Sequence, residues 1–415
     1  MKVFKFGGAS VRDAAGIKNL AGIVSKERTE LVIVVSAFGK TTNALEKILK
    51  LWLAGDNDYK NHLDTVYSYH SGVAGDLFHS AGFAKTKIDD SFALLKEYLR
   101  SSKPREYDYE YDRIVSQGEI WSTIIIAEFL KRSGLDLEWT DIRKSLVTDD
   151  RFRDANIIWD ESLKRIRTVF DFSVHRIYLT QGFIGATDEN ESTTLGREGS
   201  DYTAAVFANM LDAESQTIWK DVVSVMNADP RQFPDAVALP ELNYNEVIEM
   251  AYYGAQVIHP KTIKPLQNKG IPLYVKCFLD PALEGTVIHN RSLPALPPVI
   301  VLKEKQVLIE MSSRDFSFVG EQHVGQLYHL FEKLHIKPNL TQNGAISFLC
   351  VMDDRSDKIE KLALEAAAVL DVQVKKGLSL LTIRHYTLES VEQLIKGKTV
   401  LLRQQTPDTV QFLLG

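Results

Sequence analysis

The segment TTLGREGSDYTAA, residues 193–205, gathers several groups that could bind and activate a small anion. It contains hydroxyl side chains, the guanidinium of Arg197, the carboxylate of Asp201 and glycines, and a pattern of small residues typical of a helix follows. A guanidinium offers a planar pair of donors that matches a carboxylate, and glycine lets a ligand approach the backbone closely. The segment therefore predicts a loop that holds an anion at the start of a helix.

A second candidate lies at the N-terminus, in the sequence KFGGAS. These residues end a predicted strand and open a helix, so their free backbone N–H groups suit a phosphate. Gly7 and Gly8 permit a close approach of the backbone, and Lys5 adds a positive charge. A glycine pair after a strand is, by itself, equally consistent with an ordinary turn.

Three other motifs carry weaker signals. Glu119, in SQGEIWS, is expected at a helix start, where a carboxylate favours the helix dipole and a structural role is the simpler interpretation. The loop after residues 214–221 contains Asp229 and Arg231 and is consistent with a solvated turn. His259 precedes a proline and is expected to be a structural loop residue.

Two common nucleotide motifs are excluded. The sequence SAFGKTTNAL ends like a P-loop, but Val34 stands where the first glycine is required. What remains is a polar strand-to-helix loop in which Ser36 and Thr42 can donate hydrogen bonds. Neither G-x-G-x-x-G nor H-E-x-x-H occurs, so dinucleotide and zinc-protease functions have no motif support.

Composition predicts a soluble globular protein. Of the 415 residues, 45% are hydrophobic and 25% are charged, and the formal net charge is -6, which disfavours nucleic acid or an anionic membrane as a partner. Cys277 and Cys350 are far apart and are expected to be buried thiols in a reducing compartment. No apolar stretch has the length of a membrane span, and no signal peptide is recognisable, so we expect a cytoplasmic protein.

Strand-helix-strand order predicts an α/β fold for the first part of the chain. Apolar runs typical of buried strands occur at 2–6, 30–38, 136–141, 175–185 and 214–221. Their order favours a mostly parallel sheet, with ligands at the carboxyl ends of the strands. The stretch from about 43 to 113 is largely helical in pattern and is expected to form a side layer or an insertion.

The pattern of predicted strands and helices changes after a proline-rich segment at 291–298, which we interpret as a linker. Short strands and helices then alternate through 299–415. This pattern predicts two small α+β units in tandem, an arrangement often used to hold an effector between sheets or subunits.

Taken in order, the loops resemble those of aspartate kinases (aspartokinases), members of the amino acid kinase family. The motifs that carry this resemblance over residues 2–290 are KFGGASV, VVSAFGKTTNAL, SQGEIWS, GFIG, TTLGREGSDYTAA, ADPRQFPDA and YGAQVIHPKT. The pattern that follows is similar to the paired ACT domains of aspartokinases. The resemblance implies a catalytic domain at 1–295, with a mostly parallel sheet sandwiched by helices. It also implies two interleaved, ferredoxin-like ACT domains at 299–415 for regulation or dimerisation.

The implied reaction is transfer of a phosphoryl group from ATP to L-aspartate, giving 4-phospho-L-aspartate at the first step of lysine, threonine and methionine biosynthesis. Because the accepting carboxylate is already ionised at neutral pH, no general base is needed. The family pattern implies that Lys5 stabilises the transferring phosphoryl group and that Asp201 orients Lys5. Magnesium is expected on the phosphates with little direct protein ligation, so no metal-ligating residues are predicted. A homodimer or a larger homo-oligomer is expected.

The resemblance also implies two binding sets. The implied aspartate pocket, in which Glu119 takes the ammonium group, consists of Ser36, Thr42, Glu119, Phe183, Thr194, Arg197 and Ser200. The implied nucleotide site consists of Lys5, Phe6, Gly7, Gly8, Lys220, Asp221, Arg231, Gln256 and Lys261.

The sequence departs from the family pattern at several positions. Glu198 replaces a glycine beside Arg197, where it could weaken the grip on substrate or point to solvent. Met226 replaces a tyrosine, and Gln256 replaces a lysine whose charge Lys220 or Lys261 could supply. The segment KPNLTQNGAISF lacks the charges by which lysine-regulated members hold lysine. We therefore expect weak or no lysine inhibition, with the ACT pair serving dimerisation or another amino-acid effector such as threonine.

Three alternatives stay open on the sequence. The same fold could phosphorylate another acidic amino acid, glutamate or N-acetylglutamate, or it could serve as a non-catalytic amino-acid sensor. The chain could also be a fragment of a kinase–dehydrogenase fusion. The absence of a dinucleotide motif leads us to expect a monofunctional polypeptide.

Overall fold

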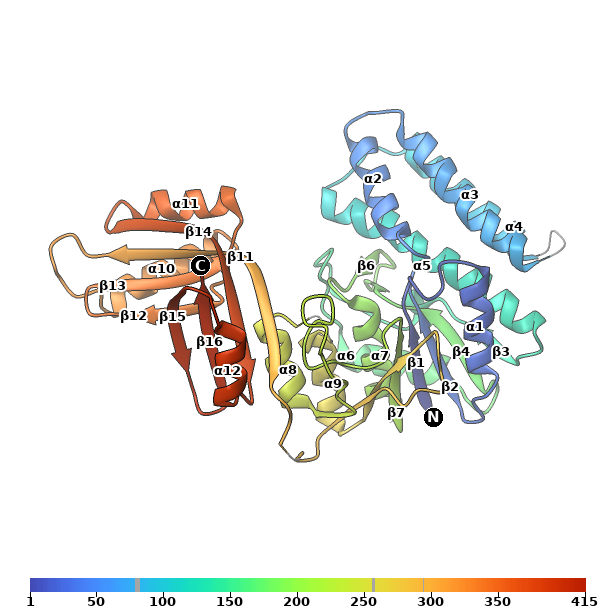
Figure 1. Ribbon diagram of the computed structural model, residues 1–415. Helices are drawn as coiled ribbons and strands as arrows, with labels where there is room; N and C mark the ends of the chain where they lie inside the picture. Colours follow the sequence, from blue (N-terminus) through green and yellow to red (C-terminus); the bar gives the residue numbers. More distant parts are fainter. Residues whose placement is uncertain (79–82, 256–257, 294) are drawn as a thin grey trace. The chain divides into compact units, whose positions relative to one another are not determined.

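The computed structural model of the protein describes residues 1–78, 83–255, 258–293 and 295–415 (Figure 1). The chain divides into two compact units. Unit 1 comprises Met1–Val225, Ala238–Ile248 and Ile258–Ser292, and unit 2 comprises Met226–Val237, Glu249–Val257 and Leu293–Gly415.

Unit 1 is built on an eight-stranded sheet with the order β3-β4-β2-β1-β7-β9-β10-β8. All neighbouring strands run parallel except β9 and β10. The mostly parallel sheet predicted from the sequence is therefore confirmed. The strands are β1 (Lys2–Phe6), β2 (Leu31–Val35), β3 (Leu137–Trp139), β4 (Ile177–Gln181), β7 (Ser215–Lys220), β8 (Glu241–Asn243), β9 (Leu273–Cys277) and β10 (Thr286–His289).

The central strands are covered on both faces. Every residue of β2 (LVIVV) and of β4 (IYLTQ) is buried, although successive side chains of a strand point to opposite faces. Helices must therefore lie on both sides, which is the layered arrangement that the continuous apolar runs predicted. A small hairpin of β5 (Ile184–Ala186) and β6 (Ser192–Thr194) projects from the end of β4 and leads into the loop at 195–198.

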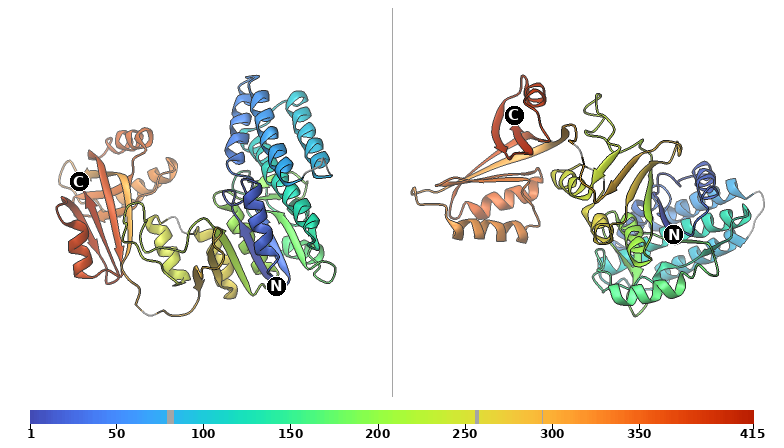
Figure 2. Two further views of the ribbon diagram at one scale, coloured as in Figure 1. Left: turned by 45° about the vertical axis from the view of Figure 1, so that its right-hand side comes forward. Right: turned by 90° about the horizontal axis from the view of Figure 1, so that it is seen from below.

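Helices fill the rest of unit 1 (Figures 1 and 2). The predicted helical stretch from about 43 to 113 is confirmed, and in Figure 1 α2, α3 and α4 lie together as a group with α5. The helices are α1 (Ala14–Val24), α2 (Thr41–Leu53), α3 (Tyr59–Leu77), α4 (Phe83–Ser101), α5 (Tyr107–Arg132), α6 (Trp159–Val169), α7 (Gly199–Met210), α8 (Tyr244–Tyr253) and α9 (Pro260–Lys269), with a 3₁₀ turn at Ile142–Lys144. Helix α8 begins in unit 1 and ends in unit 2.

One helix differs from the sequence prediction. Glu119 was expected at a helix start, but it lies in the middle of the 26-residue helix α5. The preceding residue, Gly118, serves close packing within the helix. A Cβ at Gly118 would lie 3.0 Å from Cγ2 of Thr41 and 3.2 Å from Cβ of Ala37. The glycine therefore lets α5 approach the start of α2 without interrupting the helix.

Unit 2 is built on a six-stranded antiparallel sheet with the order β12-β13-β11-β14-β16-β15. Its two longest strands, β11 (Val299–Ser312) and β14 (Asp371–Arg384), pair along most of their length. The remaining strands are β12 (Leu340–Asn343), β13 (Ser347–Asp353), β15 (Val400–Gln405) and β16 (Thr409–Leu414), and the helices are α10 (Glu321–Lys333), α11 (Ser356–Ala366) and α12 (Leu388–Ile395).

The two halves of this sheet share their long strands. The second half of β11 belongs to a core with α10 and α11, which includes Ile309, Phe331 and Leu362. The first half of β11 pairs with the end of β14, in a core that includes Ile383 and Val391 of α12. Two α+β units thus interleave in one continuous sheet. The sequence pattern predicted two such units in tandem, and the family resemblance implied that they interleave.

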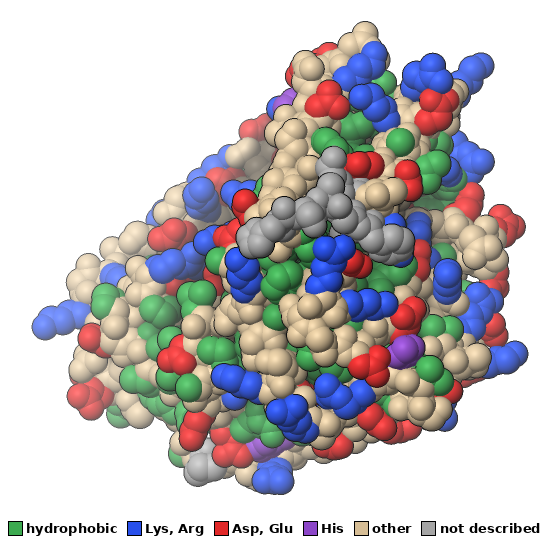
Figure 3. All heavy atoms as spheres, turned by 90° about the vertical axis from the view of Figure 1, so that its right-hand side faces the viewer, with side chains coloured by type: hydrophobic (Ala, Val, Ile, Leu, Met, Phe, Trp, Pro, Cys, Tyr) green, Lys and Arg blue, Asp and Glu red, His purple; other side chains and the backbone are tan. Residues whose placement is uncertain are grey.

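On the face shown in Figure 3, acidic and basic side chains are interspersed. Among the helices of the described ranges, none combines the length and the apolar character that crossing a membrane requires. Cys277 and Cys350 are both buried free thiols, as predicted.

Candidate active site

The candidate site lies at the carboxyl ends of adjacent parallel strands of unit 1. Lys5 lies near the end of β1, in register with Val34 of β2 and Ile218 of β7. Lys220 is the last residue of β7, and Asp201 lies in the first turn of α7. Parallel strands bring their carboxyl ends to one edge of the sheet, which is where ligands bind in such folds.

Lys5 and Asp201 form a buried ion pair at this edge. The Lys5 ammonium lies 2.7 Å from one carboxylate oxygen of Asp201, and the two side chains are only 11% and 6% exposed. The Lys220 ammonium lies 3.9 Å from the other oxygen of Asp201. Burial works to raise the pKa of Asp201, but the charges of Lys5 and Lys220 outweigh burial and the pKa is lowered. Asp201 is therefore ionised and can hold Lys5 in place.

The backbone of the loop after β1 lies close to the backbone of the loop after β2. A Cβ at Gly8 would lie 2.4 Å from the carbonyl oxygen of Ala37, so a larger residue cannot stand there. The carbonyl of Gly8 accepts the N–H of Gly39 at 2.9 Å, and the carbonyl of Phe6 accepts the N–H of Ser36 at 3.2 Å. The loops after β1 and β2 are thus joined into one cradle beside Lys5.

Glu119 reaches this edge from α5. Its side chain is buried, and one carboxylate oxygen, Oε2, has no hydrogen-bond partner among the described residues. Burial raises the pKa of Glu119 to about 8, although a hydrogen bond from the backbone of Ala37 and the charge of Lys5 work in the opposite direction. A buried oxygen without a partner is costly unless a ligand supplies a donor. The natural donor is an ammonium group.

A cavity of about 440 Å³ joins these groups. Of the residues predicted from the sequence, the cavity lining includes Lys5, Gly8, Ser36, Thr42, Glu119, Phe183, Arg197, Ser200 and Asp201. Most of the predicted substrate pocket is thus brought together around one opening. The cavity lining places three cationic side chains and three carboxyl groups around a space suited to a small zwitterion.

The loop that carries Arg197 is held in an unusual conformation. Gly196 and Glu198 both have left-handed backbone torsions, with φ of 77° and 54°. The Glu198 carboxylate accepts the backbone N–H of His259 at 3.0 Å, so this added acid fastens the loop instead of pointing freely to solvent. His259 in turn caps the start of α9, which confirms its structural role. Arg197 is exposed and pairs with no side chain in the part of the chain that the structure describes.

Other predicted residues lie outside the cavity lining. Thr194 is buried, and its hydroxyl donates to Asp112 at 2.6 Å. Phe6 is a core residue whose ring stacks on Trp219. The Lys261 ammonium donates to Asp154 and to the carbonyl of Leu195, both at 2.9 Å.

The remaining predicted nucleotide residues are spread more widely. Gly7 does not line the cavity. A Cβ added at Gly7 would lie 3.5 Å from the Lys5 ammonium nitrogen, which is an ordinary contact distance. Asp221 is exposed just after β7. Arg231 belongs to unit 2, where it pairs with Asp229 at 2.7 Å. Gln256 lies outside the described residues.

Sequence reasoning missed three residues at this site. Tyr111 and Arg153 line the cavity, and the Arg153 guanidinium lies 4.7 Å from the Tyr111 ring centre. Buried Asp112 accepts the backbone N–H groups of Arg153 and Thr194, at 2.9 and 2.8 Å. Asp112 thereby ties the 151–154 loop to β6. No motif marks these residues, because they approach the cavity only after α5 and this loop have packed together.

A family model matches the part of the chain that carries this site. The model for the amino acid kinase family matches residues 1–277. The chain belongs to the amino acid kinase family. The family's match covers all the lining residues of the cavity described above.

Individual relatives extend the comparison to the rest of the chain. The bifunctional aspartokinase/homoserine dehydrogenase 1 of Arabidopsis thaliana is 35% identical over 294 residues, which cover 69% of this amino acid kinase and 32% of the relative. This chain therefore spans about a third of the length of the first curated relatives that it matches. The lysine-sensitive aspartokinase 3 of Escherichia coli is 28% identical over 391 residues, which cover 92% of this chain and 86% of the relative.

The same fold is found in a solved structure. The crystal structure of E. coli aspartokinase III in complex with aspartate and ADP matches with a TM-score of 0.83 and 25% identity, covering 100% of this chain and 96% of the other. The resemblance to aspartokinases and the fold class predicted from the sequence motifs are confirmed by these comparisons.

Proposed function

We propose that this amino acid kinase transfers the terminal phosphoryl group of ATP to the side-chain carboxylate of L-aspartate, as a step of amino-acid biosynthesis in the cytoplasm. The observation that carries the proposal is one cavity holding the Lys5–Asp201 ion pair, the unpartnered oxygen of Glu119 and the exposed guanidinium of Arg197. The names of the relatives support aspartate as the acceptor and ATP as the donor.

The chemistry follows from the charges. The aspartate side chain is ionised at neutral pH, so one of its oxygens can attack the terminal phosphorus without a base. A new P–O bond forms while the bond to the bridging oxygen breaks, and ADP leaves with the electron pair of that bond. The main barrier is repulsion between two anions, and it is lowered by positioning and by fixed positive charge. Lys5 supplies that charge, and Asp201 holds Lys5 in place.

Substrate selectivity follows from two further lining residues of the cavity, Arg197 and Glu119. Arg197 pairs with the α-carboxylate, and the unpartnered oxygen of Glu119 accepts the α-ammonium group. An N-acylated amino acid has no such ammonium group and would leave Glu119 buried and unsatisfied. The site therefore favours a free amino acid over N-acetylglutamate, and the retention of both Lys5 and Asp201 favours a catalyst over a sensor.

The nucleotide would enter with magnesium on its phosphates. Within the described ranges, no group of three or more His, Cys, Asp or Glu side chains is arranged to hold a metal ion by itself. Asp201 is already committed to Lys5. Magnesium bound by phosphate oxygens and water suits such a site, because Mg²⁺ keeps several waters and needs few protein ligands. The ion would offset phosphate charge, while Lys5 and Lys220 act from the protein side.

The interleaved sheet of unit 2 supports a regulatory or dimerising role. We propose that it carries the contacts of a homodimer or larger homo-oligomer and responds to an amino-acid effector. The boundary of the catalytic part at 295 and of the regulatory part at 299 is part of this proposal.

The function is tested by aspartate-dependent hydroxamate formation. With ATP, Mg²⁺ and hydroxylamine, the acyl phosphate product gives a coloured hydroxamate. We expect it with L-aspartate, and at least about a hundredfold less with N-acetylglutamate, which lacks the ammonium group that Glu119 accepts. L-Glutamate keeps that group but is one methylene longer, so we expect its rate to be lower by about tenfold or more. Equal rates with N-acetylglutamate, or no hydroxamate with any of the three, would contradict the proposal.

A further inference from the structure

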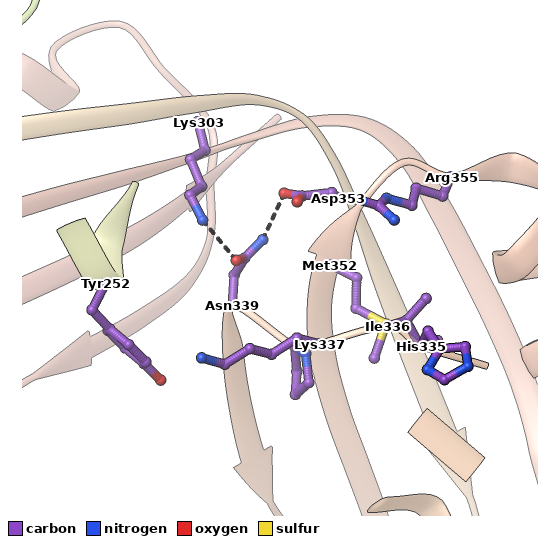
Figure 4. A pocket seen from close by; sticks show the side chains of 10 residues that line it. Tyr252, Lys303, His335, Ile336, Lys337, Asn339, Met352, Asp353 and Arg355 are labelled. Carbon is purple, nitrogen blue, oxygen red and sulfur yellow. Dashed lines mark hydrogen bonds between the residues drawn. The ribbon is translucent and has the colours of Figure 1, made fainter. Parts of the chain in front are cut away.

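A second polar cavity, of about 370 Å³, lies within unit 2 (Figure 4). Its lining comes from several elements: Tyr252 from α8, Lys303 from β11, Lys337 from the loop before β12, and Asp353 and Arg355 around the end of β13. It has no lining residue in common with the candidate active site. Its ligand must therefore be deduced from its own side chains.

The floor of the cavity is a connected hydrogen-bond network. The Lys303 ammonium donates to Oδ1 of Asn339 at 2.8 Å, and Nδ2 of Asn339 donates to Oδ1 of Asp353 at 2.9 Å. Buried Gln306 accepts from Asn339 at 2.8 Å and donates to the same Asp353 oxygen at 2.9 Å. Each side chain of the floor is thus held in place by its neighbours, which lowers the entropic cost of binding a ligand.

The stem of Lys303 is also fixed. Gly254 has a φ of 111°, and a Cβ there would lie 2.2 Å from Cε of Lys303. The lysine therefore lies directly on the backbone that follows α8. Fixing the stem and the head together directs this ammonium group into the cavity, as Figure 4 shows for its approach to Asn339.

The cavity has an excess of positive charge. Lys303, Lys337 and Arg355 face a single acid, Asp353, in its lining. In the parts of the chain that the structure describes, Lys337 and Arg355 have no ion-pair partner. Burial lowers the pKa of Lys303, and the charge of Lys337 adds to that effect against the pull of Asp353. An anion placed beside Lys303 and Lys337 would relieve this repulsion.

An apolar cavity of about 380 Å³ adjoins the cationic one. The two share Tyr252, Ile336, Lys337, Pro338 and Asn339, and the apolar cavity is lined further by Tyr328, Phe331, Glu332, Leu340 and Thr341. The Lys337 ammonium lies 4.7 Å from the centre of the Tyr252 ring, at the junction of the two cavities. A ligand that fills both cavities needs an anionic head and an apolar group.

We propose that these joined cavities bind a small organic anion, whose carboxylate or phosphate meets Lys303 and Lys337 and whose apolar group lies against Tyr252, Tyr328 and Phe331. Carboxylate and phosphate are both compact oxyanions that accept hydrogen bonds from ammonium groups. The site is independent of the proposed kinase reaction, because none of its residues belongs to the candidate active site.

The proposal is tested by isothermal titration of the full-length chain with phenylacetate, phenyl phosphate and inorganic phosphate. We expect saturable binding of at least one aromatic anion, with a dissociation constant at least about tenfold lower than that of inorganic phosphate. The aromatic anion that binds more tightly identifies the head group. The change Lys337→Met, at an exposed position, should raise the dissociation constant of that anion about tenfold. The change Lys303→Met, which keeps an apolar stem against Gly254, should raise it by a similar factor.

Two controls separate this site from other sources of binding. Lys361→Met removes the same charge from an exposed position of α11 outside both cavities and should leave the affinity unchanged. Lys5→Met should also leave it unchanged, because Lys5 lines the active-site cavity. The proposal is overturned if neither aromatic anion binds, if inorganic phosphate binds as tightly as the better of the two aromatic anions, or if Lys5→Met abolishes binding that Lys337→Met retains.

Discussion

At the residue scale, the protonation of Glu119 should couple binding of the proposed substrate, aspartate, to pH. Burial raises the pKa of Glu119 to about 8, so its carboxyl group is largely protonated at pH 7 before substrate binds. The aspartate ammonium pairs with the ionised form, and binding must release this proton. Raising the pH from 6.5 towards 8.5 should therefore lower the Michaelis constant for aspartate.

The variant Glu119→Gln separates this effect from others. The amide cannot ionise, so the Michaelis constant for aspartate should become nearly independent of pH over the same range. At pH 8.5 it should lie roughly 10- to 100-fold above the wild-type value, because a charge-assisted hydrogen bond contributes about 1.5–3 kcal/mol. Steady-state kinetics at five pH values measure both quantities. An unchanged pH profile in the variant would show that another group is responsible.

Gln256 stands where the family pattern has a lysine, so another lysine should supply the positive charge beside the nucleotide. Lys220 lies 3.9 Å from Asp201, whereas the Lys261 ammonium is held by Asp154 and by the carbonyl of Leu195. Lys220→Ala should therefore raise the Michaelis constant for ATP about tenfold, and Lys261→Ala should raise it less. If both variants kept the wild-type constant, neither lysine would be a nucleotide contact.

Much of the site could be predicted residue by residue, because its motifs place charged groups at strand ends and helix starts. Lys5, Arg197 and Asp201 are examples, and they line one cavity. Tyr111 and Arg153 could not be found in this way. Their position depends on buried Asp112, which joins two segments about 40 residues apart in the chain.

At the scale of elements, the packing of α5 on α2 depends on Gly118. Glycine within a helix normally costs about 0.5–1 kcal/mol relative to alanine. Gly75 of α3 has no neighbour within 4 Å of an added Cβ, so Gly75→Ala should raise the free energy of unfolding by about that amount. At Gly118, the added Cβ would press on Thr41, Ala37 and Leu45 at 3.0–3.2 Å.

The matched pair of variants tests this packing. Because overpacking in a core costs about 1–3 kcal/mol, Gly118→Ala should be less stable than wild type and clearly less stable than Gly75→Ala. Urea unfolding followed by circular dichroism measures the difference. An equal gain in both variants would show that the α2–α5 crossing has room for a methyl group.

Glu119 was expected at a helix start and lies inside α5. Glycine is unfavourable inside a helix, so Gly118 needs a packing reason to occupy this position. The partner that makes it necessary, Thr41, is 77 positions earlier in the sequence, and only the folded structure brings the two together. The continuous apolar strands, by contrast, were predictable, since burial on both faces leaves a local signature in the sequence.

At the scale of the whole molecule, unit 2 should respond to lysine differently from the corresponding part of the lysine-sensitive relative in E. coli, if it has the regulatory role proposed above. The segment 337–348 carries amides where lysine-regulated aspartokinases carry acids, and the Asn339 side chain is committed to Lys303, Gln306 and Asp353. We expect lysine to inhibit weakly or not at all in an aspartate kinase assay. Threonine and methionine provide the comparison, and thermal shift measures binding of each. Strong lysine inhibition that is lost on mutating Asn343 would contradict this expectation.

The interleaved sheet of unit 2 was predictable in outline from the alternation of short strands and helices. The sharing of β11 and β14 between its two halves could be expected only from the family resemblance. Local patterns cannot show that one 14-residue strand serves two cores, because the pairing joins residues about 60 to 85 positions apart. The oligomer that this sheet would support is measurable by light scattering, and we expect at least a dimer.

The central claim is that the Lys5 ammonium neutralises the charge between two anionic reactants. Its most direct test is the single-turnover rate of phosphoryl transfer in Lys5→Met, with binding of ATP and aspartate measured separately. We predict a fall of at least about 10²–10³-fold in the rate, since losing one preorganised electrostatic contact costs that much, while the dissociation constant for aspartate changes only a few-fold. A variant that transfers phosphate within tenfold of the wild-type rate would contradict the account.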